Sequence, residues 1–176
     1  MITNTEILNY IFATRISQTQ KRYLLGDNTQ KGLDSIDSSL FWINSRFVKA
    51  GKVEFFNSFV DSVYLMSSGN VANLGTVKAY FKTIDSDNYL KLSMLFDAMI
   101  LLAIYNIYSG TEQESIGLDK KNQAIEIIEG ILGDSAFAGD NGKSNKTEAV
   151  VSIALPDEDT KTAETYNFRI RRGYTR

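Results

Sequence analysis

The chain has 176 residues, a net charge of −2, and neither Cys nor His. Disulfides, thiolate chemistry, His-ligated metals and His-based catalytic triads are therefore excluded, and the charge argues against non-specific binding to nucleic acid. The length predicts one domain with room for an appendage, and 43% hydrophobic residues is typical of a globular core. Because His is the commonest general acid–base residue, we expect a protein that is not an enzyme and needs no cofactor.

The first fifty residues have the pattern of three helices. Thr3 and Glu6 have the spacing of a capping box, which predicts a helix over about 4–14. A second, short helix is expected over 17–25, ended by Gly26. A third is predicted by apolar residues that share one helix face and should stop near Gly51. These residues are Leu33, Ile36, Leu40, Ile43 and Phe47.

The sequence leaves the secondary structure of the middle of the chain open between helix and strand. Residues 52–66 fit helical spacing, although their β-branched and aromatic content also suits a strand, and helix is the favoured interpretation. A loop is expected over 67–70. Residues 71–84 could form a short helix interrupted at Gly75.

A long apolar stretch follows and is predicted to be the central helix. Ser86 or Asp87 should cap it, and it should end near Ser109, spanning roughly 30 Å. Lys91 and Asp97 interrupt it, so we expect a buried helix and no membrane span. An amphipathic helix over about 119–132 is expected next, with Gly133 just after its end. Residues 1–134 are thus predicted to be a helical bundle around one long buried helix.

The last forty residues change character. Residues 135–146 are rich in Gly, Asn, Ser and Lys and are interpreted as a flexible linker. Within 147–176, apolar residues alternate at Val151, Ile153 and Leu155, and again from Tyr166, which predicts two strands. The expected fold class is therefore mainly α, with a C-terminal β-hairpin or a strand arm that pairs with a neighbour.

Three segments superficially suggest a chemical site. Residues 139–144 end like a phosphate-binding loop, but Phe137 stands where that motif needs Gly, so a linker is favoured. Residues 85–88 suggest a calcium loop, yet the loop Gly and distal Glu are missing, and helix capping explains them. Asp97, on the apolar helix, could be a functional acid. The favoured alternative is that it meets an Arg or a helix end, or reaches the surface.

The C-terminal strand and tail form the best candidate contact surface, because aromatic and Arg side chains are enriched at interface hot spots. A protein partner is the favoured interpretation. A solvated edge strand and a site for single-stranded nucleic acid remain alternatives. The candidate partner-binding residues are Tyr166, Phe168, Arg169, Arg171, Arg172, Tyr174 and Arg176.

The order of these patterns resembles the Mu-like family of tailed-phage head-to-tail connector (adaptor, or head-completion) proteins. The resemblance covers residues 3–50 and 88–134. It starts from the Thr and acid before the first short helix. It continues through "GLDSIDSSLFWINSRF", "LKLSMLFDAMILLAIYNIY" and "KKNQAIEIIEGILGD", which closes on Gly133.

The resemblance implies a structural virion protein of the neck, assembled in the host cytoplasm. Such adaptors form a closed homo-oligomeric ring, usually twelve-fold, that binds the portal protein and docks the next neck or tail protein. DNA passes through the ring without specific binding. From the residues alone, the alternative is a soluble protein-binding module that uses the Arg- and Tyr-rich C-terminal strand. An enzyme working with carboxylates and Lys alone is the least favoured hypothesis.

Overall fold

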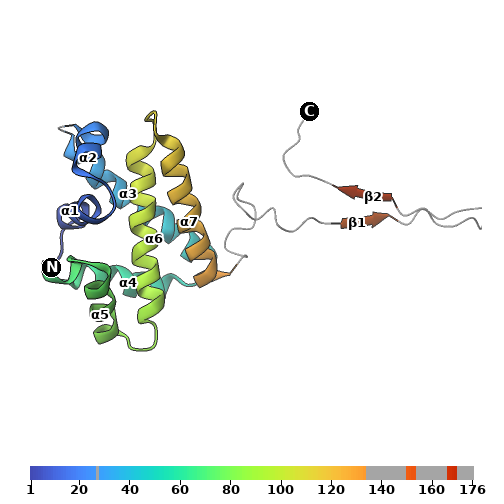
Figure 1. Cartoon of the computed structure of the whole chain (residues 1–176). Coiled ribbons are helices and arrows are strands. Elements are labelled where there is room, and N and C mark those ends of the chain that lie inside the picture. The colour runs from blue at the N-terminus through green and yellow to red at the C-terminus, as the bar shows by residue number, and fades with distance from the viewer. Residues whose placement is uncertain (27, 134–149, 154–165, 170–176) are drawn as a thin grey trace, which may run out of the picture. The chain divides into compact units, whose positions relative to one another are not determined.

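The computed structural model describes residues 1–26, 28–133, 150–153 and 166–169, and the chain divides into two units, 1–136 and 137–176. The described part of the first unit is helical (Figure 1), which confirms the expected mainly helical fold. Its α-helices are α1 (Asn4–Thr14), α2 (Gln18–Leu25), α3 (Thr29–Lys49), α4 (Val53–Leu65), α5 (Leu74–Ile84), α6 (Tyr89–Tyr108) and α7 (Glu114–Leu132).

Helix α6 is the centre of this unit. It packs lengthwise against α7 and also contacts α3 and α5 (Figure 1). Thirteen of its twenty residues are buried, including Leu95, Phe96 and Ile107. By length and composition alone α6 could cross a membrane, but 67% of its most apolar window is buried within the helical unit. The prediction of a helical bundle around one long buried helix is confirmed.

A continuous aromatic cluster joins α6 to four other helices. Ring centroids 5.8–6.3 Å apart link Phe47 of α3 to α4, α4 to α5, and α5 to Phe96 of α6, which in turn lies 6.0 Å from Tyr10 of α1. Tilted and edge-on aromatic pairs at such distances add to the free energy of burial. The rings involved are Tyr10, Phe47, Phe56, Phe59, Phe81 and Phe96.

The helix starts follow local capping. Thr3 and Glu6 form the predicted capping box, with the Thr3 amide donating to the Glu6 carboxylate at 2.8 Å. Ser17 caps α2 in the same way with Gln20. The side chain of Asn28 accepts from the Lys31 amide at 3.2 Å and starts α3.

The buried face of α3 differs in part from the apolar face expected. Ile36, Ile43 and Phe47 are fully buried, but Leu33 and Leu40 are only half-buried, and small residues are buried between them. A Cβ on one of these, Gly32, would lie 2.7 Å from the Leu8 side chain. Because these residues are small, α1 and α6 can approach α3 closely. The buried face of α3 is therefore rotated relative to the predicted apolar face. The buried small residues are Gly32, Ser35 and Ser39.

The structure shows which secondary structure residues 53–84 adopt. Residues 53–65 are helix, as favoured. The expected loop contains a 3₁₀ turn, η1 (Ser68–Val71). Helix α5 starts after Asn73, whose side chain accepts from the Thr76 amide at 3.0 Å. Gly75 therefore lies within the first turn of α5, and the predicted interruption of the helix there is wrong.

The starts of α6 and α7 also differ from expectation. The residue that caps α6 is Asn88, so the predicted caps Ser86 and Asp87 are wrong. They lie instead in a turn that Asp85 closes by accepting from the Asn88 amide at 2.9 Å. Helix α7 begins at Glu114, a full turn before the expected start, and the end at Gly133 (φ +87°) is as predicted.

The second unit contains two described strands, β1 (Val150–Ile153) and β2 (Tyr166–Arg169). They pair antiparallel, with Val150 opposite Arg169 and Ile153 opposite Tyr166. The predicted linker 135–146 and the remainder of 147–176 lie outside the described residues.

Candidate interaction surface

The outer face of α3 carries the most exposed aromatic residue of the described chain. The side chain of Phe41 is 76% exposed, although its neighbours Leu40 and Trp42 are half-buried. Aromatic residues are enriched in the contact surfaces of proteins, so Phe41 beside Trp42 makes this face a candidate contact surface. Phe41 is not among the contact residues predicted from the sequence, because the apolar spacing of α3 marks only its buried face. The signal available was a large aromatic residue on the polar side of α3.

A groove of about 530 Å³ lies beside Phe41, between α3, α6 and α7. Lys121 of α7 lies over the Tyr105 ring at 5.0 Å, and Arg46 lies over the Trp42 ring at 4.6 Å. These cation–π contacts hold aromatic faces in place along the groove walls. The lining residues are Asp37, Ser38, Ser39, Phe41, Trp42, Leu102, Tyr105, Asn106 and Lys121.

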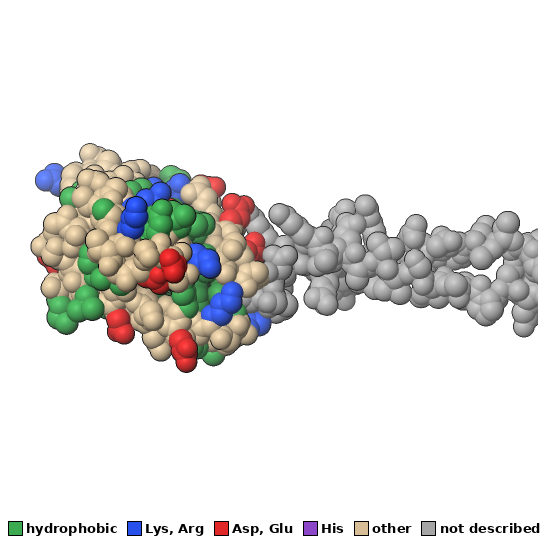
Figure 2. Space-filling model, turned by 90° about the horizontal axis from the view of Figure 1, so that it is seen from below, with side chains coloured by type: hydrophobic (Ala, Val, Ile, Leu, Met, Phe, Trp, Pro, Cys, Tyr) green, Lys and Arg blue, Asp and Glu red, His purple; other side chains and the backbone are tan. Residues whose placement is uncertain are grey.

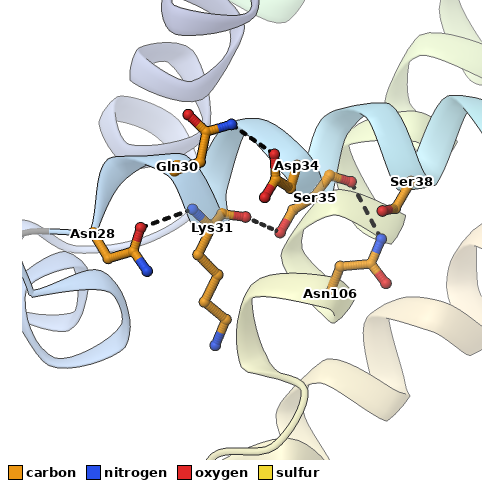
Figure 3. Close-up of a pocket in the computed structure, with 7 residues that line it drawn as sticks. All are labelled: Asn28, Gln30, Lys31, Asp34, Ser35, Ser38 and Asn106. Carbon is orange, nitrogen blue, oxygen red and sulfur yellow. Dashed lines mark hydrogen bonds between the residues drawn. The ribbon is translucent and has the colours of Figure 1, made fainter.

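A smaller hollow of about 320 Å³ lies at the start of α3 (Figure 3). Its polar groups already bond one another. The Asn106 amide donates to the Ser35 carbonyl at 3.2 Å, and Gln30 donates to Asp34 at 2.7 Å. The Lys31 ammonium donates to the Ser109 carbonyl at 3.5 Å. We interpret this hollow as the polar rim of the groove, since its donors and acceptors are largely satisfied.

Large hydrophobic residues are also exposed on α4, α5 and the first turns of α6. Seen from the α5 end, the molecule shows hydrophobic side chains gathered among Lys, Arg, Asp and Glu (Figure 2). A hollow of about 600 Å³ is lined there by residues that include Phe55, Ile84 and Leu92. The large exposed hydrophobic residues of these helices are Leu65, Leu74, Ile84, Leu90 and Met94, each 42–60% exposed.

Asp97, the candidate functional acid, forms an ion pair with Arg15 at the end of α1. Both side chains are a little under one-third exposed. This confirms the alternative in which Asp97 meets an Arg. The pair tethers the α1–α2 connection to the middle of α6, and its partial exposure limits the pair to about 1 kcal/mol of stability or less.

In the acidic turn before α6, the hydrogen bonds of Asp85 go to other residues of the same turn. The Asp85 carboxylate accepts from the Asn88 side chain and amide, both at 2.9 Å, and from the Asp87 amide at 3.0 Å. These hydrogen bonds from Asn88, first through its side chain, lower the pKa of Asp85 below its ordinary value. Among the residues that the structure describes, no cluster of three or more acidic residues could hold a metal ion.

The predicted partner-binding residues fall in the second unit. Tyr166, Phe168 and Arg169 lie on β2, where Phe168 is paired with Val151 of β1. Arg171, Arg172, Tyr174 and Arg176 lie outside the described residues, as does the Gly- and Ser-containing segment 139–144. The prediction for these seven residues stays a prediction.

Comparisons with models of protein families, with curated proteins and with solved structures gave no match for this chain.

Proposed function

We propose that the chain is a structural subunit of a head-to-tail connector ring in the neck of a tailed-phage virion. The ring would bind the portal protein, dock the next neck or tail protein and extend the DNA channel. The proposal starts from the resemblance of residues 3–50 and 88–134 to Mu-like connector proteins. It requires a body with a rigid core and exposed surfaces that can contact neighbours.

The exposed hydrophobic residues of α4, α5 and α6, above all Leu90 and Met94, are the observation that carries this proposal. A closed ring repeats a heterologous contact, in which one patch of a subunit meets a different part of the next subunit. Leu90 and Met94 lie one turn apart on α6 and are 49% and 43% exposed, next to the fully buried Leu95. Such a patch on a rigid helix suits one half of this contact. The other half would be the arm 147–176 of the neighbouring subunit, with its aromatic residues laid on the patch.

The charge distribution is consistent with a channel for DNA. Residues 110–165 contain 12 Asp and Glu against 5 Lys, a local net charge of −7. Gripping DNA requires Lys and Arg facing the phosphates, so a segment of this net charge would not hold the duplex.

The test is the mass of the full chain, alone and mixed with the portal protein encoded by the same genome, by light scattering and electron microscopy. We expect closed rings or a portal complex. Leu90→Glu should prevent assembly, whereas Leu118→Glu, at a residue 46% exposed on α7, should leave it intact. A chain that stays monomeric and ignores the portal protein would contradict the proposal.

The binding-module alternative rests on the last eleven residues, which carry four Arg and no acid. One variant, the chain that ends at residue 159, distinguishes the two functions. If the module hypothesis is right, this variant loses one partner and its assembly state does not change. If the connector proposal is right, it loses ring assembly or portal binding.

A further inference from the structure

The hollow between α4 and the turn that joins α5 to α6 combines acidic and apolar side chains. Among the described residues that line it, Glu54 and Asp85 carry carboxylates and none is Lys or Arg. Phe55 and Ile84 add apolar surface, and Ile84 is 50% exposed. The volume of about 600 Å³ is within the range of clefts that bind ligands. The lining therefore suits a partner that is both cationic and aromatic.

The negative charge of this hollow is not neutralised within the described unit. The exposed Glu54 carboxylate has no ion pair or hydrogen bond with any described residue. Lys52, two residues before it, donates instead to the Ile131 carbonyl of α7 at 3.2 Å. Asp85 contributes a second negative charge, although its hydrogen bonds go to its own turn. A cationic group from another molecule is therefore attracted to the hollow, with Glu54 available to accept from it.

The end of the chain has the complementary composition. Residues 166–176 contain four Arg, three aromatic residues and no acid. A guanidinium group forms two-point hydrogen bonds with a carboxylate, and it also stacks on aromatic faces. Residues 134–149 can span roughly 50 Å when extended, which exceeds the length of α6, roughly 30 Å. The end of one chain is therefore long enough to reach the hollow of a neighbouring copy.

We propose that this hollow binds residues 169–176 of a neighbouring copy of the chain, with an Arg guanidinium paired to Glu54. The inference rests on the proposed function, because it names the site on one subunit that receives the arm of the next. The basic residues of the arm enter the hollow, and its aromatic residues lie on the hydrophobic side chains beside it, including Ile84. The contact is heterologous, so it can be repeated around a ring.

Disulfide cross-linking tests the contact in the full chain, which has no Cys of its own. Ser58 lines the hollow and is exposed, and Gly173 follows two Arg in the sequence. Ser58→Cys and Gly173→Cys are made in separate chains, one with a mass tag, and the mixture is oxidised. The matched control replaces Ser58→Cys with Ser115→Cys, at an exposed position on α7. We expect the first mixture to give about ten times more of the mixed disulfide than the control, because a disulfide forms only between close residues.

Charge reversal tests the role of Glu54 in the same cross-linking measurement. Glu54→Arg in the Ser58→Cys chain should lower the yield about tenfold, and reversing Arg171 and Arg172 to Glu in the other chain should do the same. Combining the two reversed chains should restore the yield. Glu114→Arg is the matched control, since Glu54 and Glu114 are both exposed acids in the first turn of a helix, and it should leave the yield unchanged. Circular dichroism should show each variant folded.

Three results overturn the inference: a yield equal to that of the Ser115→Cys control, a yield that charge reversal does not change, or a disulfide that forms only within one chain when both Cys are placed in it. Rings that bind the portal protein without the cross-link between Ser58→Cys and Gly173→Cys overturn this inference and leave the connector proposal standing. A cross-link between chains that ignore the portal protein supports the contact and contradicts the connector proposal.

Discussion

Single polar side chains set where the first helices begin. Glu6 accepts hydrogen bonds from the amide and hydroxyl of Thr3, at 2.8 and 3.0 Å. These bonds, led by the one from the amide, lower the pKa of Glu6 below its ordinary value of 4.5. An Ncap side chain with such a partner satisfies backbone donors at the start of α1 that have no partner inside the helix.

The lowered pKa of Glu6 predicts a pH-dependent contribution to stability. The contribution is complete above the unfolded-state pKa near 4.5 and is lost as the pH falls through the lower, folded-state pKa. Glu6→Gln keeps the shape of the side chain and removes its charge. We therefore expect this variant to be less stable than wild type at pH 7, and by a smaller amount at pH 3, measured by urea unfolding. An equal stability difference at both pH values would contradict this role for the carboxylate.

At the scale of elements, α7 packs along α6 and contains two glycines in different surroundings. A Cβ on Gly117 would lie 2.9 Å from Cβ of Tyr108 and 3.2 Å from the backbone carbonyl oxygen of Tyr105, so α6 allows no side chain there. A Cβ on Gly130 would meet nothing within 4 Å. Gly117 thus permits the close approach of the two helices, while Gly130 only weakens α7.

The two glycines give a matched pair of substitutions on one helix. Gly130→Ala should stabilise the protein by about 0.5–1 kcal/mol, because Ala loses less backbone entropy in a helix. Gly117→Ala should destabilise it by about 1–3 kcal/mol, because the added methyl group meets backbone that cannot move cheaply. Chemical unfolding of both variants measures the difference. Equal stabilities would show that the α6–α7 contact is not tight at Gly117.

At the scale of the whole molecule, the helical unit has a core of its own. Its largest fully buried side chains, including Phe47, Phe59 and Phe96, come from within residues 1–133. A chain cut after residue 136 should therefore keep its helical circular dichroism and unfold within about 2 °C of the full chain. Phe96→Ala in the shortened chain is the control and should cost about 3–5 kcal/mol. A shortened chain that is unfolded would show that the second unit contributes to this core.

Helices whose ends are set by nearby residues could be predicted. The signals are the caps Thr3 and Ser17, the helix end at Gly133 and the apolar composition of 89–108. Each acts within a few residues, so the sequence by itself determined the bundle and its central helix. The groove could not be read from it, because it depends on how α3, α6 and α7 pack together.

Tertiary contacts decided the remaining features. The sequence alone left residues 53–65 between helix and strand, because β-branched and aromatic residues suit both. Burial of Phe56 and Phe59 in the aromatic cluster selects helix. The buried face of α3 turned toward Gly32, Ser35 and Ser39, since only small residues admit a neighbouring helix at close range. That rotation leaves Phe41 in solvent, because a helix that buries one side exposes the other.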